Sequence, residues 1–277
     1  MTEALFPAGP ALPALPPLSA LPTHTGKRAH ITAITSGKGG VGKTFVSANL
    51  AAALARLGKR VLVLDADLGL ANLDVVLNLF PKITLHDVFT GKHPLLQAIL
   101  PAPGGFSVLL AGSGMVEYSR MTPQVREQLQ AVIEQVTPMF DHVLLDTGAG
   151  ISDVVLYTVS LAHDVLVVAT PEPTSLTDAY ATIKVLANVQ GRRAVRLVVN
   201  QTQKPSDGRN VRHQLQQVVD RYVNPGLESP LHIELLGEVP SDAAVREAVQ
   251  GRYLMLLRAP GAPAAAGIGA VAARMIA

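Results

Sequence analysis

One stretch decides the fold of this chain: Gly37-Lys38-Gly39-Gly40-Val41-Gly42-Lys43-Thr44. It matches G-x-x-x-x-G-K-[ST], the pattern of a phosphate-binding loop, in which glycines let backbone N–H groups close around phosphate oxygens. Residues 30–35 before it form a short β-branched and apolar run, which predicts a buried strand. Residues 45–57 after it are rich in Ala and Leu and end at Gly58, which predicts a helix. Strand, loop and helix thus come in the order that a phosphate site needs.

The loop predicts a bound nucleoside triphosphate with Mg²⁺. We expect Lys43 to reach the β and γ phosphates and the Thr44 hydroxyl to lie on Mg²⁺. The helix that begins near Lys43 directs its positive end at the same anion. A glycine-rich turn that matches by chance is the alternative, and the flanking strand and helix disfavour it. The predicted phosphate-binding residues are Gly37, Lys38, Gly39, Gly40, Val41, Gly42, Lys43 and Thr44.

Acidic residues end two further predicted strands. The apolar run 60–64 leads into Asp65 and Asp67, and the run 142–145 leads into Asp146. Because ligands bind at the carboxyl ends of strands in open α/β sheets, we expect these carboxylates beside the phosphate loop. A metal site or a positioned water suits Asp65 and Asp67 better than solubility does. A buried strand that ends in one acid predicts that Asp146 holds Mg²⁺, usually through water, with a helix-capping carboxylate as the alternative.

The rest of the chain alternates predicted strands and helices. At 277 residues, 48% apolar and 16% charged, it is long enough for one large α/β domain over residues 29–277. We expect a three-layer fold, in which a mostly parallel sheet is flanked by helices on both faces. Residues 1–28 are interrupted by prolines throughout, which predicts a disordered tail.

Three predicted helices carry signals at their starts. Thr122 precedes a proline, Ser175 and Asp178 form a variant of a capping box, and Ser241 precedes the helix after the last strand. Between these elements, residues 85–100 are predicted to form helix and loop. The further strands are predicted at 106–110, 164–170, 194–199 and 235–239, and the further helices at 122–136, 175–190 and 264–276.

Composition excludes several function classes. The chain has no cysteine, which excludes disulfides, thiolate catalysis and cysteine-ligated metal sites, iron–sulfur clusters included, and fits a reducing cytosol. With 23 basic and 21 acidic residues, it lacks the charge of an obvious nucleic-acid-binding protein. No apolar run approaches the roughly 20 residues of a membrane-spanning helix. We expect a cytoplasmic protein, with peripheral recruitment to the inner membrane as the alternative.

Lys38 carries a resemblance to a known family. An ordinary phosphate loop has no need of a lysine at this position, and a solvated surface charge is the alternative reading. Its placement beside a γ-phosphate resembles the signature lysine of the MinD/ParA class of deviant Walker ATPases. The resemblance implies that ATP and Mg²⁺ bridge a homodimer and that Lys38 crosses to the partner's phosphates. It also implies that Asp67 orients the attacking water and that Asp65 supports Mg²⁺ indirectly, so the catalytic residues would be Lys38, Lys43 and Asp67.

The resemblance extends to other parts of the nucleotide site. It places Asn200 and the segment at Pro240 beside adenine, and a turn-forming role is the alternative for Asn200. Glu172, assigned to the nucleotide site as well, and Asp178 would lie near the dimer and partner face. The segments that respond to the γ-phosphate would be residues 68–74 and 147–150.

Three strings are closer to one branch of the family. Residues 64–74, 146–152 and 170–180 resemble the FlhG branch, also called FleN, whose members control flagellar number and placement in bacteria. The resemblance implies slow ATP hydrolysis to ADP and phosphate, dimerisation with ATP, and protein partners from the flagellar system. Those partners would be an FlhF-like GTPase, a flagellar switch component or a transcriptional activator.

Two departures from that branch limit what is expected. The short DQAxxLR helix that stimulates FlhF is not found in residues 1–28, so activation of FlhF is not expected. Residues 267–276 hold one cation and two glycines, and we favour a core helix over a membrane-binding amphipathic helix there. Membrane binding would then be indirect or would need both tails of a dimer.

Two other functions stay open within the family. A ParA-like protein would bind DNA as the ATP dimer, but the basic residues between 192 and 221 are interpreted as a solvated face rather than a DNA patch. A MinD-like protein would regulate the division site. Salt-sensitive, ATP-dependent DNA binding would identify the first, and pelleting with lipid vesicles the second.

Overall fold

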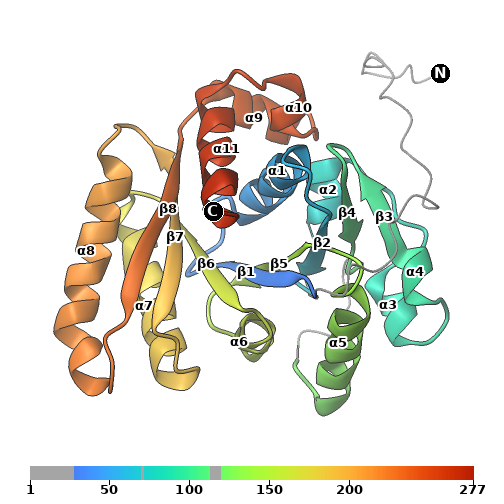
Figure 1. Cartoon of the computed structure of the whole chain (residues 1–277), viewed down its shortest axis with the longest axis horizontal. Helices are drawn as coiled ribbons and strands as arrows, with labels where there is room; N and C mark the ends of the chain where they lie inside the picture. The colour runs from blue at the N-terminus through green and yellow to red at the C-terminus, as the bar shows by residue number, and fades with distance from the viewer. Residues whose placement is uncertain (1–27, 70–71, 113–119) are drawn as a thin grey trace, which may run out of the picture.

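The computed structural model describes residues 28–69, 72–112 and 120–277, so the tail predicted at 1–28 lies almost wholly outside it. In this described part, eight strands form one sheet in the order β3-β4-β2-β5-β1-β6-β7-β8 (Figure 1). Neighbouring strands are parallel except β3 and β4, which are antiparallel. The strands are β1 (His30–Ser36), β2 (Val61–Ala66), β3 (Ile99–Ala102), β4 (Phe106–Leu109), β5 (His142–Ala149), β6 (Asp164–Ala169), β7 (Ala194–Thr202) and β8 (His232–Pro240).

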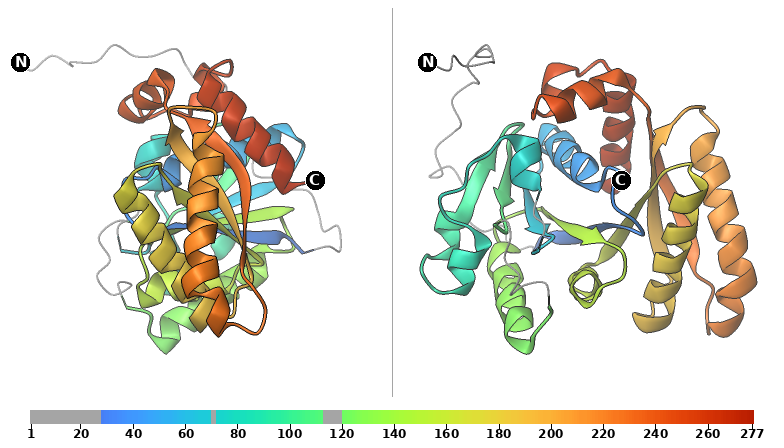
Figure 2. Two further views of the ribbon diagram at one scale, coloured as in Figure 1. Left: turned by 90° about the vertical axis from the view of Figure 1, so that its left-hand side faces the viewer. Right: turned by 180° about the vertical axis from the view of Figure 1, so that it is seen from behind.

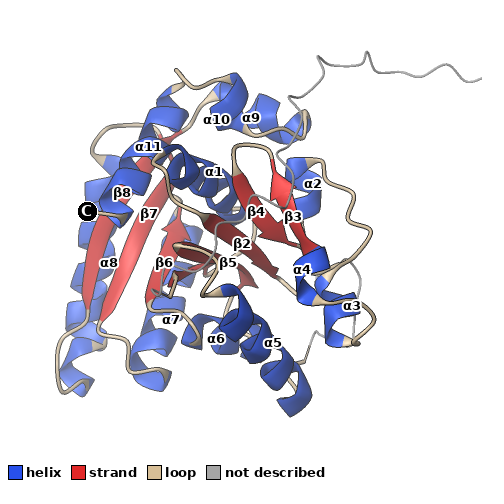
Figure 3. Cartoon of the chain, turned by 45° about the vertical axis from the view of Figure 1, so that its right-hand side comes forward, coloured by secondary structure: helices blue, strands red, loops and turns tan. Residues whose placement is uncertain are grey.

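Helices cover both faces of this sheet (Figure 3). One layer holds α1 (Lys43–Arg56), α2 (Leu73–Leu77), α9 (Ala243–Gln250), α10 (Met255–Arg258) and α11 (Pro263–Met275). The other holds α3 (Leu85–Phe89), α4 (Leu95–Ala98), α5 (Pro123–Val136), α6 (Asp153–Ser160), α7 (Pro173–Val189) and α8 (Asp207–Tyr222), which is followed by a 3-10 turn at Asn224–Gly226. The side and back views of Figure 2 show the same layers, so the expected three-layer fold is confirmed.

Two cores, one on each face, explain why the central strands read as continuous apolar runs. Every residue of β2 is buried. Val61 and Val63 pack into the core below α1, whereas Leu62 and Leu64 pack into the core on the opposite face. A strand covered on both faces has no polar side to display, because successive side chains point to opposite faces.

The helix start predicted at Thr122 is confirmed, but the one predicted at Ser175 is wrong. Helix α7 begins at Pro173, directly after Glu172. The Ser175 hydroxyl accepts a hydrogen bond from the backbone N–H of Thr170 at 2.9 Å, so it ties the helix to the end of β6 instead of capping it. A side chain one turn inside the helix can do this because the chain folds back tightly after β6.

The helix start predicted at Ser241 is wrong as well, here by one residue. The Asp242 carboxylate accepts from the backbone N–H of Ala244 at 2.9 Å and therefore caps α9. Its other oxygen accepts from the backbone N–H of Ala264, in the first turn of α11, at 3.2 Å. Asp242 thus joins two helices, which a local capping rule does not anticipate.

The edge of the sheet at β3 differs from the expectation of helix and loop over residues 85–100. The short helices α3 and α4 fall in this range, but β3 begins at Ile99 and pairs antiparallel with β4. Pro101 lies within β3, where it is tolerated because proline has no backbone N–H and an edge strand has no further strand on its outer side that needs one.

The last helix packs into the core, as predicted for residues 264–276. A Cβ on Gly267 would come within 2.5 Å of the carbonyl oxygen of Glu238, and one on Gly237 would meet a methyl group of Val271. The two glycines therefore allow α11 to lie directly on β8. None of the helices in the described ranges is both long and apolar enough for a membrane span.

Side chains engage the backbone of β8, the other edge strand. Arg212 Nε donates to the carbonyl oxygen of Ile233 at 2.9 Å, and Arg274 Nη1 donates to that of Leu236 at 2.9 Å. The backbone N–H of Ile233 donates to Gln216 Oε1 at 2.8 Å. The helices α8 and α11, which flank this edge, therefore satisfy polar groups that no further strand pairs.

Candidate active site

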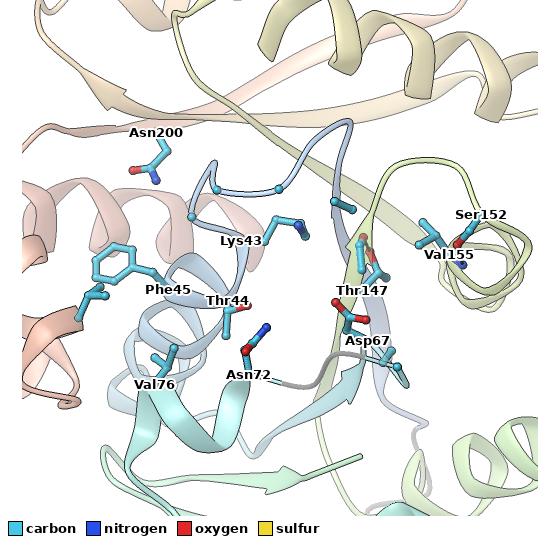
Figure 4. A pocket seen from close by; sticks show the side chains of 18 of the residues that line it. Lys43, Thr44, Phe45, Asp67, Asn72, Val76, Thr147, Ser152, Val155 and Asn200 are labelled. Atoms are coloured by element: carbon cyan, nitrogen blue, oxygen red, sulfur yellow. Dashed lines mark hydrogen bonds between the residues drawn. The ribbon is translucent and has the colours of Figure 1, made fainter. Parts of the chain in front are cut away.

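A pocket of about 1010 Å³ opens at the carboxyl ends of the central strands (Figure 4). Its walls come from the glycine loop after β1, the ends of β2, β5 and β7, and helices α2, α6 and α9. This is the edge at which ligands bind in open α/β sheets. The loop and the acidic strand ends predicted from the sequence therefore meet in one cavity large enough for a nucleotide.

The glycine loop needs glycine at three of its positions. Gly40 and Gly42 have positive φ angles of 81° and 91°, a conformation that favours residues without Cβ. Gly37 lies so close to helix α7 that a Cβ would collide with the backbone of Asp178. Helix α1 begins directly after Gly42, at Lys43, as the loop pattern predicts. The backbone shape fits a phosphate cradle at the N-terminus of a helix.

Lys43 points into the pocket and is largely buried. Burial lowers the pKa of its ammonium group, while Asp146 and Asp67 oppose the shift. Figure 4 places Lys43 and Thr44 in the middle of the pocket, with Asp67 and Thr147 at one end. A phosphate chain laid along this line would favour the charged form of the ammonium group, which burial disfavours.

Asp146 lies in the buried part of β5, three residues before the strand ends, and is 3% exposed. Burial raises its pKa to about 6, although hydrogen bonds from Ser47 and Thr44 and the charge of Lys43 oppose the shift. The Ser47 hydroxyl is 2.8 Å from Asp146 Oδ1. A buried carboxylate beside a threonine hydroxyl and a phosphate cradle fits Mg²⁺, which is bound through one or two protein groups plus substrate phosphates.

No cluster of three or more acidic or histidine side chains in the described residues could hold a metal ion without the nucleotide. This agrees with a Mg²⁺ site completed by phosphates rather than by a protein cage. Asp146 and Thr44 would hold the ion, and the capping role considered as the alternative for Asp146 does not apply, because its partners are side chains of α1.

Asp65 fastens the segment that carries Asp67. Its Oδ1 accepts from the backbone N–H of Asp67 at 3.2 Å, and its Oδ2 accepts from that of Leu73 at 3.3 Å. Burial, and then the charge of Asp146, raise the pKa of Asp65 well above its usual value. The carboxyl group therefore closes the loop between β2 and α2, a role that the sequence analysis described only as indirect support of Mg²⁺.

The Asp67 side chain lines the pocket opposite the glycine loop. A Cβ on Gly148 would lie 3.4 Å from its carboxylate, so this glycine leaves room for it. The segment 147–150 predicted to respond to the γ-phosphate is strand as far as Ala149, and its positive φ comes at Gly150, 85°. Asp67 and the end of β5 thus face the same part of the cavity.

Lys38 lies outside the pocket lining and is bound within its own chain. Its Nζ is 3.0 Å from Glu172 Oε2 and 2.8 Å from Thr174 Oγ1, at the start of α7. Two predicted site residues, Lys38 and Glu172, are therefore brought together. Their contact with each other does not follow from the sequence, in which they lie 134 residues apart.

Asn200 and Pro240 lie at the other end of the site. Asn200 lines the pocket, is 4% exposed, and donates through Nδ2 to the carbonyl oxygen of Val41 at 2.8 Å. Pro240 ends β8 and is not among the residues that line the cavity. The roles of both beside adenine stay predictions, and Asn200 has a further one, support of the glycine loop.

Sequence reasoning missed the apolar wall of the cavity. It consists of Phe45, Val76, Val245 and Val249, with Gln201 at its rim in a positive-φ conformation of 60°. The signal for α9 was present, since Val245 and Val249 are four residues apart and so share one face of a helix. Figure 4 shows Phe45 on the same side of the pocket as Asn200, away from Asp67.

Asp146→Asn is expected to stabilise the nucleotide-free protein at pH 8. The difference between a pKa of 3.8 and one of about 6 corresponds to about 3 kcal/mol, because each pKa unit is worth 1.36 kcal/mol. Because the folded pKa is the higher one, the ionised carboxylate costs stability above pH 6, and this cost disappears as the pH falls from 6 to 3.8. Urea unfolding at pH 8 and pH 5 measures the difference, which should shrink at pH 5. A variant less stable than wild type at pH 8 would contradict the prediction.

Three comparisons place the chain among known proteins. The ParA family model, described as "NUBPL iron-transfer P-loop NTPase", matches residues 27–276. Antiactivator FleN of Pseudomonas aeruginosa is 42% identical over 88% of this chain and 85% of FleN. Flagellum site-determining protein YlxH of Helicobacter pylori is 33% identical over 82% of this chain and 75% of YlxH. Septum site-determining protein MinD of Pyrococcus horikoshii, complexed with Mg-ADP, matches the structure with a TM-score of 0.70 at 26% identity over 89% of this chain and 96% of MinD.

These matches confirm the resemblance inferred from Lys38 and the three sequence strings. The matches span most of each related protein, and the sheet with helices on both faces is shared with MinD. Nucleotide and Mg²⁺ binding follow from the glycine loop and from the Mg-ADP held by a relative of the same fold. The chain belongs to the ParA/MinD family of P-loop ATPases.

Proposed function

We propose that the protein is an ATP-dependent dimerising switch that controls flagellar number and placement. Its similarity to FleN and YlxH supports the flagellar role. The position of Lys38 supports the dimer and carries the proposal. A lysine on the loop but outside its own pocket has an ammonium group that its own nucleotide does not need.

Glu172 would compete with the phosphates of a second copy for the ammonium group of Lys38. In the single chain, Glu172 and Thr174 hold its ammonium group at 3.0 and 2.8 Å. A triphosphate presented by a second copy carries more negative charge than one carboxylate, so it would draw Lys38 away from Glu172. Dimerisation would then depend on the γ-phosphate, and the contact of Lys38 with the start of α7 would break at the same time.

The remaining residues would serve the hydrolysis that ends the dimer. Lys43 and the loop N–H groups bind the phosphates, while Thr44 and Asp146 hold Mg²⁺, which neutralises charge on the phosphates when bound. Asp67 orients the attacking water from the opposite wall, and Asp65 fixes the backbone of Asp67. Such a reaction needs positioning and charge stabilisation rather than covalent chemistry, which suits this set of groups.

The proposal includes where the protein acts and with what. The ATPase domain spans residues 29–277, the tail precedes it, and the protein acts in the cytoplasm with recruitment to the inner membrane through partners. Those partners belong to the flagellar system: an FlhF-like GTPase, a switch component or a transcriptional activator. Similarity to MinD favours a division-site regulator as the second candidate. The packing of α11 into the core supports neither direct membrane binding nor that candidate.

Lys38→Ala is expected to leave ADP binding within about 3-fold of wild type but to abolish dimerisation with Mg²⁺ and a non-hydrolysable ATP analogue. The reason is that Lys38 lies outside its own pocket and would contact only the partner's phosphates. Light scattering after size-exclusion chromatography gives the mass of each species. Lys92→Ala, which removes an exposed cation after α3, is the matched control.

Two outcomes would contradict the proposal at separate points. If wild type stays monomeric with the analogue bound, or if Lys38→Ala dimerises like wild type, the switch mechanism fails. The flagellar role is tested in the source bacterium by counting flagella on cells that carry Lys38→Ala in place of the natural gene. An unchanged number and position of flagella would remove that role while leaving the dimer intact.

A further inference from the structure

Ser47 lies one helical turn after Lys43 on α1 and is completely buried. Its Oγ is within hydrogen-bond distance of two acceptors: Asp146 Oδ1 at 2.8 Å and the carbonyl oxygen of Lys43 at 3.0 Å. A hydroxyl has one proton to donate. Hydrogen bonds to a carboxylate are shorter and stronger than those to a peptide carbonyl, so the proton goes to Asp146 when the acid is ionised.

Asp146 has few other means of holding its orientation. It lies within β5, is 3% exposed, and takes its side-chain hydrogen bonds from two hydroxyls of α1, those of Thr44 and Ser47. Thr44 lines the pocket and Ser47 does not. Of the two donors, Ser47 is therefore the one that a ligand leaves in place.

We propose that Ser47 is a positioning residue for the Mg²⁺ site of this ATPase. By donating to Oδ1, it fixes the Asp146 carboxylate toward Thr44 and the phosphate loop, although Ser47 itself touches neither ion nor nucleotide. Groups that orient a metal ligand in this way commonly contribute 10- to 100-fold to metal affinity. The role is distinct from helix packing, since the hydroxyl crosses from α1 to β5.

The test compares ADP binding with saturating Mg²⁺ and with EDTA, measured by isothermal titration calorimetry on the full chain. We expect Ser47→Ala to lose about 10-fold or more of the affinity gained from Mg²⁺, and to bind ADP in EDTA within about 2-fold of wild type. Ser47→Thr keeps a hydroxyl and is expected to restore the Mg²⁺ dependence. Thr158→Val is the matched control, because Thr158 is completely buried and donates at 2.9 Å to the carbonyl oxygen four residues earlier, that of Val154.

Two results would overturn the proposal. Equal losses of affinity in Mg²⁺ and in EDTA would assign Ser47 to packing alone, and a Mg²⁺ dependence like that of wild type would mean that the hydroxyl serves the Lys43 carbonyl. If Ser47→Ala does not fold, Ser47→Val has nearly the shape of the Thr variant but no donor, and an unchanged Mg²⁺ dependence in that variant overturns the proposal as well. Dimerisation does not enter the measurement, so the result is independent of the proposed switch.

Discussion

Lys43→Ala is expected to abolish nucleotide binding, with a rise of at least about 100-fold in the Kd for ATP in the presence of Mg²⁺. Lys43 is the buried cation in the middle of the pocket, at the start of α1. Two charge-assisted hydrogen bonds to phosphates, at about 1.5–3 kcal/mol each, account for a loss of that size. Titration calorimetry with ATP and Mg²⁺ measures it.

We expect Lys43→Ala to remain folded, so that a loss of binding can be assigned to the missing ammonium group. Burial lowers the pKa of Lys43 because the charged form is less favourable in the folded protein than in water, and removal of the ammonium group relieves that cost. We therefore expect the nucleotide-free variant to melt at or above the temperature of wild type. Binding of ATP within a few-fold of wild type would show that the loop does not hold the phosphates as proposed.

Asp67→Ala is expected to do the opposite: to keep ATP and to trap the dimer. Its carboxylate lies across the cavity from the glycine loop, beside Gly148, where it can orient a water but is not needed to hold the nucleotide. Loss of a group that positions or activates the attacking water commonly lowers turnover by 10² to 10⁴-fold. Phosphate release and the mass of the species formed with ATP are the two measurements.

Asp67→Asn serves as the control for shape, since it keeps the size of the side chain and removes the charge. We expect it to hydrolyse ATP slowly as well and to remain dimeric with ATP for longer than wild type. If Asp67→Ala is monomeric at saturating ATP, or if it turns over ATP as fast as wild type, then Asp67 does not orient the attacking water.

Most of the fold was predictable because its determinants are local. The loop at 37–44 and the apolar run of β2 can each be recognised from a few consecutive residues, and both occur where expected. Ser175 and Asp242 show where local reasoning fails. The first bonds back to Thr170 and the second also holds Ala264 of α11, and neither contact follows from spacing along one helix.

The site shows the same limit more sharply. The motifs predicted which residues gather at the sheet edge, because strand ends in a parallel sheet must meet there. They did not predict that Asp65 bonds to the backbone on both sides of a loop, or that Lys38 is held by Glu172 at 3.0 Å. These contacts depend on how segments far apart in the chain are placed, and the charge of each group does not predict its partner. Ser47 gave a weak signal in the sequence, because it is a polar residue in a helix otherwise rich in alanine and leucine.

The two arginines that bond to the backbone of β8, Arg212 of α8 and Arg274 of α11, bear on how large an assembly can grow. With Ile233 and Leu236 already occupied by Arg212 and Arg274, that border of the sheet offers little template for another chain to extend. In the proposed dimer, two identical nucleotide faces joined about a twofold axis cover each other, so neither remains for a further copy. Such a pair would form at high concentration without extending into fibres along the β8 edge.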